Sequence, residues 1–131
     1  MRIGCIGGGP GGLFFAIQAR RRDPSRVVEV WDRNPPGATY GFGVVFSDEA
    51  MEAIRLADEE VHAAIVRDGA RWSEIDVHLR GRVYTSGGHG FTAMTRSRLV
   101  TILQERAEAS DADVSSANRC IDRALHPGDC G

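Results

Sequence analysis

Three glycines near the amino terminus, Gly7, Gly9 and Gly12, have the spacing G-x-G-x-x-G. A glycine at the first position permits a tight turn, and one at the second lets backbone N–H groups approach a pyrophosphate. The third lets a helix pack closely on the preceding strand. The phosphates would lie at the positive amino-terminal end of that helix. The spacing therefore predicts a nucleotide-binding turn.

A carboxylate stands where such a turn needs one. Asp32 follows Gly12 by 20 residues, the separation typical of an acid that ends the second strand and accepts hydrogen bonds from an adenosine ribose. In a simpler interpretation, the glycines only make a turn and Asp32 only ends a strand at the surface. The order strand, glycine turn, helix, strand and acid favours the nucleotide site.

The apolar pattern indicates the elements that would position these residues. The short apolar run 3–6 predicts a buried strand, and the segment 13–19 predicts a helix that ends in the basic run 20–22. A second apolar run, 27–31, predicts a strand parallel to the first. The sequence therefore predicts an α/β fold of the Rossmann type, in which helices cover a parallel sheet.

Composition and charge limit the possible functions. A chain of 131 residues forms one domain at most, and a net charge of −2 provides no basis for binding nucleic acid. No run approaches ~18 apolar residues and no basic leader is present, so we expect a cytoplasmic chain without a membrane span or signal peptide. The three cysteines, Cys5, Cys120 and Cys130, lack metal-ligand spacing, which predicts reduced thiols and no metal.

The segment 40–46 is rich in aromatic residues and glycine. It either lays its backbone against a planar ligand or forms a small strand with Phe42 and Phe46 in the core, and the residues alone favour neither. After it, Ser47 is a good N-cap for a helix. Asp58 begins another helix, which we expect to end at Gly69.

Alternating apolar and polar residues over 75–79, with a return over 83–85, predict a β-hairpin that is half buried on one face. The glycine-rich segment 86–91 is predicted as a loop, either in close approach to a ligand or, as composition favours, linking two elements. His89 in this segment is the best polar candidate for an acid or base, although a structural role is favoured.

A final helix is predicted from the apolar residues at helical spacing, which are Leu99, Ile102, Leu103 and Ala107. Arg96 falls in the first turn of this helix. A cation at that position opposes the helix dipole unless it binds an anion.

Three segments resemble a known family. They read CIGGGPGGLFFAI, YGFGVVFSDEAME and IDVHLRGRVYTSGGHGFTAMTRSRLVTIL. Together they are similar to the amino-terminal part of the flavin-dependent aromatic hydroxylases of the para-hydroxybenzoate hydroxylase class, in particular those that act on aromatic acyl-CoA thioesters. The likeness extends over residues 1–109 and includes loops as well as core, so it is far more specific than the glycine motif alone.

The resemblance implies that the nucleotide is FAD and that the fold is an incomplete Rossmann-type FAD-binding domain with a small β-hairpin. The residues that it places on the cofactor are Gly7, Gly9, Pro10, Gly11, Gly12, Asp32, Arg33, Gly43, Val44, Val45 and Arg96. The glycine turn would hold the pyrophosphate, Asp32 and Arg33 the adenosine, and Arg96 the phosphate and ribityl region. The segment 43–45 would lie beside the flavin ring.

The family chemistry implied is reduction of FAD by NADH or NADPH, followed by transfer of one oxygen atom from O₂ to an aromatic ring. The implied partner is a small aromatic substrate, which we suspect to be an acyl-CoA thioester. None of the residues is a convincing acid or base catalyst, so the sequence assigns no catalytic residue.

Family members are several times longer, and the segment 110–131 departs from their pattern. We expect residues 1–109 to form the amino-terminal portion of the FAD-binding domain and 110–131 to be a divergent or truncated, poorly ordered tail in which only Val114 has a strand-like core position. Such a fragment would expose a sheet edge, which predicts inactivity alone and either self-association or a completing chain. The alternative is a non-catalytic dinucleotide-binding module or a partner-completing subunit.

Overall fold

The computed structural model describes residues 1–34 and 41–116. The chain divides into two compact units, one formed by Met1–Gly41 with Ser97–Gly131 and the other by Phe42–Arg96. The second unit is therefore one continuous segment inserted between two parts of the first.

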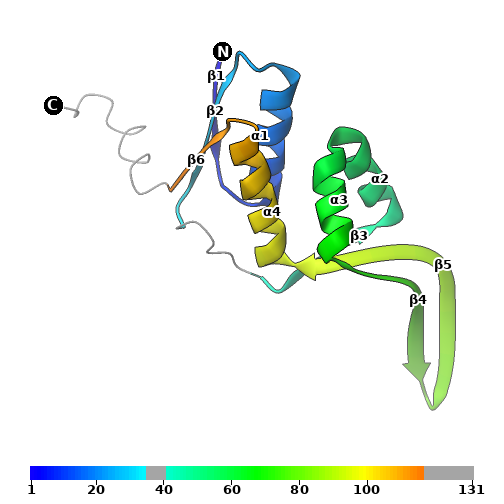
Figure 1. Ribbon diagram of the computed structural model, residues 1–131. Coiled ribbons are helices and arrows are strands. Elements are labelled where there is room, and N and C mark those ends of the chain that lie inside the picture. The colour runs from blue at the N-terminus through cyan, green and yellow to red at the C-terminus, as the bar shows by residue number, and fades with distance from the viewer. Residues whose placement is uncertain (35–40, 117–131) are drawn as a thin grey trace. The chain divides into compact units, whose positions relative to one another are not determined.

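The first unit contains a parallel sheet with the strand order β1-β2-β6 (Figure 1). Its strands are β1 (Arg2–Ile6), β2 (Val27–Asp32) and β6 (Asp113–Ser116), and its helices are α1 (Pro10–Arg22) and nearly all of α4 (Arg96–Ala109). In this sheet Val30 is paired with Cys5 on one side and Val114 on the other. The predicted α/β class with a parallel sheet is confirmed.

Apolar side chains of the two helices and of β2 form the core of this unit. The buried residues are Leu13, Ala16, Ile17, Ala19, Val28, Val30, Leu99, Val100, Ile102, Leu103 and Ala107. The helical spacing of the last helix was therefore correctly predicted. Within the described residues β1 pairs only with β2, so the other edge of β1 is unpaired.

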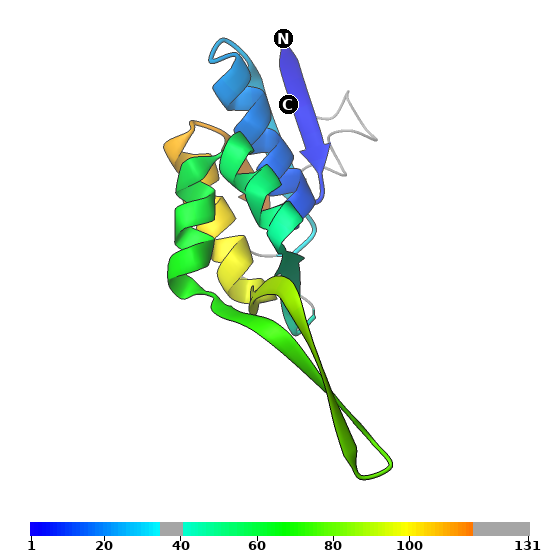
Figure 2. The same cartoon turned by 90° about the vertical axis from the view of Figure 1, so that its right-hand side faces the viewer.

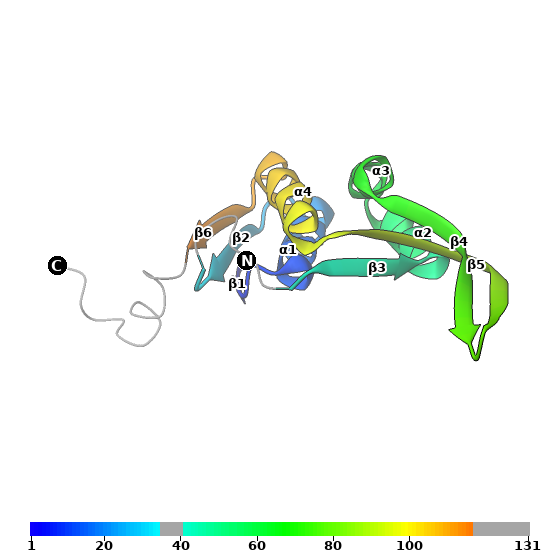
Figure 3. The ribbon, with the colours of Figure 1, turned by 90° about the horizontal axis from the view of Figure 1, so that it is seen from below.

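The second unit is an antiparallel sheet of strand order β3-β5-β4 with two helices (Figure 3). The elements are β3 (Gly43–Ser47), α2 (Asp48–Ala57), α3 (Glu59–Asp68), β4 (Ala70–Leu79) and β5 (Arg82–Thr95). Both helix starts are capped as expected, because Ser47 Oγ accepts a hydrogen bond from Ala50 N at 3.2 Å and the Asp58 carboxylate accepts from the first turn of α3.

The region 40–46 and the segment 86–91 differ from some of the expectations. Phe46 lies in β3 and is half-buried, but Phe42 is fully exposed, so Phe42 is not a core residue. The predicted loop 86–91 is wrong, because these residues belong to β5. Gly88, with φ of +83°, lies where the pairing of β5 with β4 is interrupted, and this irregularity accounts for the glycines that suggested a loop.

The β4–β5 hairpin is present but its predicted burial is wrong. All residues of β4 and residues 82–89 of β5 are exposed, and Figure 2 shows the hairpin as a long twisted ribbon of two strands. The alternating sequence correctly indicated a strand pair. It could not show that nothing within the described residues covers either face.

The segment after α4 also differs from the expectation of poor order. Residues 113–116 form strand β6, which pairs with β2, whereas residues 117–131 lie outside the described residues. The domain boundary at residue 109 stays a prediction. No helix in the described part of the chain is long and apolar enough to cross a membrane.

Candidate functional site

The glycine turn between β1 and α1 has the geometry that its spacing predicts. Gly7 has a φ of +111°, a conformation that favours glycine, and its N–H donates to the Trp31 carbonyl at 2.7 Å. A methyl group at Gly12 would overlap the Gly7 carbonyl oxygen. The first glycine therefore permits the turn, and the third permits close packing of α1 on it.

The amino-terminal end of α1 is open to an anion. Gly9 is the N-cap and supplies no side-chain cap, Pro10 occupies the first turn, and that turn contains no acidic residue. The bond from Leu13 N to Gly9 O, at 3.0 Å, closes the first turn of the helix, so the N–H groups of Gly11 and Gly12 precede the helical hydrogen-bond pattern. These donors and the helix dipole favour a phosphate at this position.

Asp32 lies directly beside this turn. Its Oδ2 atom accepts a hydrogen bond from Gly8 N at 2.6 Å, and Oδ1 accepts from Asn34 N at 2.8 Å. The bond from Asn34 and then that from Gly8 hold the pKa of Asp32 below its usual range, against partial burial, which raises it. Asp32 is therefore an ionised acceptor at neutral pH, next to the glycines that could bind a pyrophosphate.

The remaining candidates lie at three places. Arg33 follows Asp32 in the first unit and is exposed. In the second unit, Gly43, Val44 and Val45 begin β3, and Val45 is 58% exposed. Because Arg96 N donates to the Phe42 carbonyl at 3.4 Å, the start of α4 adjoins the start of β3.

Arg96 has a side-chain donor without an acceptor. Its Nε atom is buried and has no hydrogen-bond partner among the described residues. The first turn of α4 has no acidic residue that could offset this cation. A buried, unpaired donor on a cation is costly unless an anion or another acceptor meets it, which makes Arg96 a candidate anion ligand.

His89 is exposed on β5 rather than in a loop. Its Nε2 atom lies 3.4 Å from Ser86 Oγ, and its ring centroid is 6.3 Å from that of Phe91. These contacts with Ser86 and Phe91 are local, and they do not form an arrangement in which His89 could act as a general acid or base. The sequence assigned no catalytic residue, and this geometry adds none.

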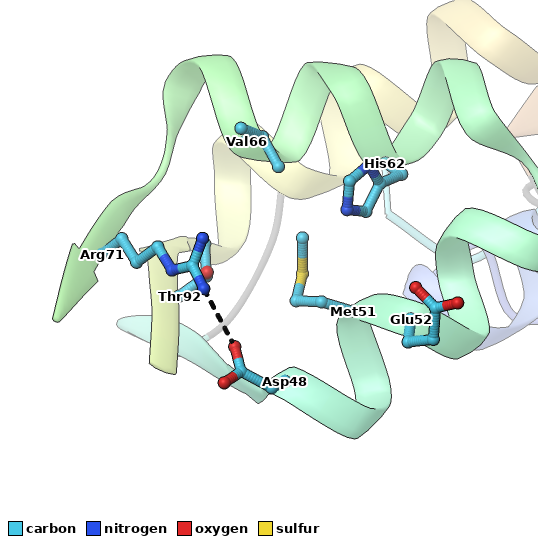
Figure 4. A pocket seen from close by; sticks show the side chains of 7 residues that line it. All are labelled: Asp48, Met51, Glu52, His62, Val66, Arg71 and Thr92. Carbon is cyan, nitrogen blue, oxygen red and sulfur yellow. Dashed lines mark hydrogen bonds and ion pairs between the residues drawn. The ribbon is translucent and has the colours of Figure 1, made fainter. Parts of the chain in front are cut away.

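The second unit contains a cavity of about 470 Å³ that no feature of the sequence had indicated (Figure 4). Its lining residues are Asp48, Met51, Glu52, His62, Val66, Arg71 and Thr92. Arg71 and Asp48 form an ion pair at 3.4 Å on one side of it, and the buried Met51 gives it an apolar wall. The lining comes from α2, α3, β4 and β5 and consists of common residue types without a recognisable motif, so the sequence did not indicate it.

Two solved structures share the fold of this chain. The tetrameric form of 2-methyl-3-hydroxypyridine-5-carboxylic acid oxygenase superimposes with a TM-score of 0.76 and 19% identity, covering 88% of this chain and 31% of that protein. CtdE, solved in complex with FAD and a substrate, gives a TM-score of 0.73 and 21% identity, covering 88% of this chain and 30% of CtdE. These identities establish the fold only.

The curated relatives are aromatic hydroxylases. The chain is 42% identical over 124 residues to salicyloyl-CoA 5-hydroxylase of a Streptomyces species, across 95% of this chain and 24% of that enzyme. It is 33% identical over 125 residues to 3-hydroxy-4-methyl-anthranilyl-[aryl-carrier protein] 5-monooxygenase of Streptosporangium sibiricum, across 95% of this chain and 35% of the relative.

The resemblance to aromatic hydroxylases is therefore confirmed, and this chain is a homologue of part of such monooxygenases. It spans about a quarter of the length of the first relative and about a third of the length of the second. No family model matches the chain.

Proposed function

We propose that this chain binds FAD as part of a flavin-dependent aromatic monooxygenase. The observation that carries the proposal is the contact between the glycine turn and Asp32, in which Gly8 N lies 2.6 Å from the carboxylate beside the open end of α1. The pyrophosphate would bind the N–H groups of the turn, and Asp32 would accept hydrogen bonds from the adenosine ribose. Arg33 would lie on the adenosine side.

By the resemblance to the flavin-dependent hydroxylases, we assign the candidates on the second unit to the same cofactor. The buried Nε of Arg96, which has no hydrogen-bond partner among the described residues, would donate to a phosphate or ribityl oxygen of FAD. The exposed Val45, with Gly43 and Val44, would provide apolar surface for the flavin ring. CtdE, which shares this fold, was solved in complex with FAD, and this supports FAD as the ligand.

Titration of the purified chain with FAD, followed by quenching of flavin fluorescence, tests the proposal. We expect saturable binding to the parent and a loss of about 1–3 kcal/mol on Asp32→Ala, because the ribose hydroxyls lose a charged acceptor. Glu29→Ala is the matched control on the same strand, since Glu29 makes a surface ion pair with Arg2 and surface pairs contribute little. Equal affinity of parent and Asp32→Ala, or binding of NAD in preference to FAD, would refute the assignment.

We further propose that the monooxygenase acts on an aromatic acyl thioester in the cytoplasm, with NADH or NADPH as reductant. The name of the Streptomyces relative, a salicyloyl-CoA hydroxylase, supports this substrate class. When bound, FAD would supply the oxygen chemistry, and the chain would hold the cofactor and exclude water from one side. A completing chain or self-association would provide the rest of the substrate pocket.

The chain alone should not hydroxylate. We expect FAD, NADH or NADPH and salicyloyl-CoA to give at most slow nicotinamide oxidation with hydrogen peroxide as product, because coupled oxygen transfer needs a water-excluding pocket around the ring. Mass spectrometry of the thioester and a peroxide assay measure the two outcomes. Stoichiometric hydroxylated product would show that this chain forms a complete pocket.

A further inference from the structure

The cavity of the second unit lies between two helices and one side of the antiparallel sheet. The helical residues that line it stand three or four positions apart, which places them on one side of each helix. They are Asp48, Met51 and Glu52 on α2 and His62 and Val66 on α3. The strand residues of the lining, Arg71 and Thr92, are direct partners in the pairing of β4 with β5, so they share one side of the sheet.

The cavity has two polar ends and an apolar middle. Arg71 and Asp48 lie at one end and Glu52 and His62 at the other, with Met51 between them (Figure 4). Asp48 and Glu52 are one turn apart on α2, a rise of about 6 Å. Met51 is only 6% exposed. The lining therefore matches a molecule that has a polar group at each end of an apolar body.

The end with Arg71 can donate further hydrogen bonds. Among the described residues, the Arg71 guanidinium makes one bond, from Nη2 to Asp48 Oδ1 at 3.4 Å, and an ion pair as exposed as this one contributes little. Thr92 is 5% exposed, and its hydroxyl has no hydrogen bond within the described residues. A buried hydroxyl without a partner is costly. This end therefore has the donors that a carboxylate requires.

The end with Glu52 can accept hydrogen bonds. The Glu52 carboxylate accepts from Arg55 Nη2 at 2.6 Å and from Arg55 Nε at 2.7 Å, and these bonds hold the pKa of Glu52 below its usual range. Glu52 is therefore ionised at neutral pH. A carboxylate can accept about four hydrogen bonds, so acceptor sites remain beside the His62 ring. An ammonium group would be bound well at this end.

The charges around the cavity balance. Asp48 and Glu52 are negative, whereas Arg71 and the neighbouring Arg55 are positive. A ligand with a net charge would leave one of these groups without compensation, but a ligand with one charge of each sign would not. The thioether of Met51 favours contact with an aromatic ring. A rigid ring would also keep the two charged groups apart.

We propose that this cavity binds an aromatic zwitterion, a small molecule with a carboxylate and an ammonium group at opposite ends of a ring. The carboxylate accepts hydrogen bonds from Arg71 and Thr92, the ammonium group donates to Glu52, and the ring lies on Met51. The volume of about 470 Å³ is within the usual range of small-molecule sites. All these residues belong to the second unit, so the inference does not depend on the flavin site.

Titration of the purified chain with 4-(aminomethyl)benzoate tests the proposal. Two matched probes each lack one charged group: 4-methylbenzoate has no ammonium group, and 4-methylbenzylamine has no carboxylate. Isothermal titration should give a Kd of about 1 mM or lower for the zwitterion and values about tenfold or more higher for the other two. The chain has three methionines, so labelled methionine methyl groups give a simple NMR spectrum. The ring should shift the signal of Met51, assigned with Met51→Leu, and leave that of Met94 unchanged.

Two variants test the two ends separately. Arg71→Met should weaken binding of the zwitterion about tenfold, to the level of 4-methylbenzylamine, because the carboxylate loses its charged donor. Glu52→Gln should weaken it towards the level of 4-methylbenzoate. Arg67→Met is the matched control, since it removes the same charge from an ion pair with Asp68 that lies outside the lining, and it should leave the affinity unchanged.

Three results would overturn the proposal. The first is a Met51 signal that does not move at about 10 mM zwitterion, tenfold above the expected Kd. The second is equal affinity for the three probes, which would mean that the two ends do not recognise charge. The third is an equal loss of affinity in Arg71→Met and Arg67→Met, which would show an effect of net charge rather than binding in this cavity.

Discussion

Gly12→Ala should destabilise the first unit by about 3 kcal/mol or more and abolish FAD binding, because the added methyl group overlaps the Gly7 carbonyl oxygen. Both atoms belong to the backbone turn or are fixed to it, so neither can rotate away as a long side chain could. The turn or the helix must move instead. Thermal unfolding followed by circular dichroism at 222 nm, with a flavin titration on the same samples, measures the two losses.

Gly11→Ala is the matched control for stability. A methyl group at Gly11 meets no atom within 4 Å, and alanine is a better helix former than glycine. We expect its melting temperature to equal or exceed that of the parent. If Gly12→Ala melts within about 2 °C of the parent, the close contact in the glycine turn does not determine the stability of this unit.

Arg96→Met should weaken FAD binding by about ten- to a hundredfold, which corresponds to the loss of one charge-assisted hydrogen bond. The cofactor-free protein should be equally stable or more stable, since the change removes a buried donor without a partner and a cation from the first turn of α4. A substitution that weakens ligand binding while it maintains or raises the stability of the free protein indicates a residue that serves the ligand rather than the fold. Isothermal titration and thermal unfolding measure its two parts.

Arg98→Met is the control on the same helix. Arg98 makes interactions within the protein, so its replacement should lower stability slightly and leave FAD affinity unchanged. If Arg96→Met instead lowered stability while FAD affinity stayed constant, Arg96 would be a structural residue and the anion assignment would be wrong.

The first unit could be predicted from sequence because its signals are local. The glycine spacing determines the turn, the helical spacing of apolar residues determines α4, and the position of Asp32 follows from strand length and a short connection. Each of these features depends on residues within one element or its neighbour. The structure accordingly reproduces them.

The predictions that failed concern how one element pairs with another or is covered by another. Alternation over 75–79 indicates a strand with two unlike faces but not whether a second layer covers one of them. The glycines at 86–91 were interpreted as a loop because composition does not show that β5 continues past an irregularity in its pairing with β4, between Trp72 and Glu74. β6 has few apolar residues of its own, and it forms a strand because β2 offers a paired edge.

The division of the chain into an interrupted unit and an inserted one has a consequence for folding kinetics. Val30 on β2 pairs with Val114 on β6, 84 positions later (114 − 30), and the whole segment Phe42–Arg96 lies between them. Closing so long a loop before any pairing of β6 is gained makes the addition of β6 to the parallel sheet a slow, late step. During synthesis β1, α1 and β2 emerge long before β6 and leave a growing chain with an unpaired strand edge, the species that chaperones bind.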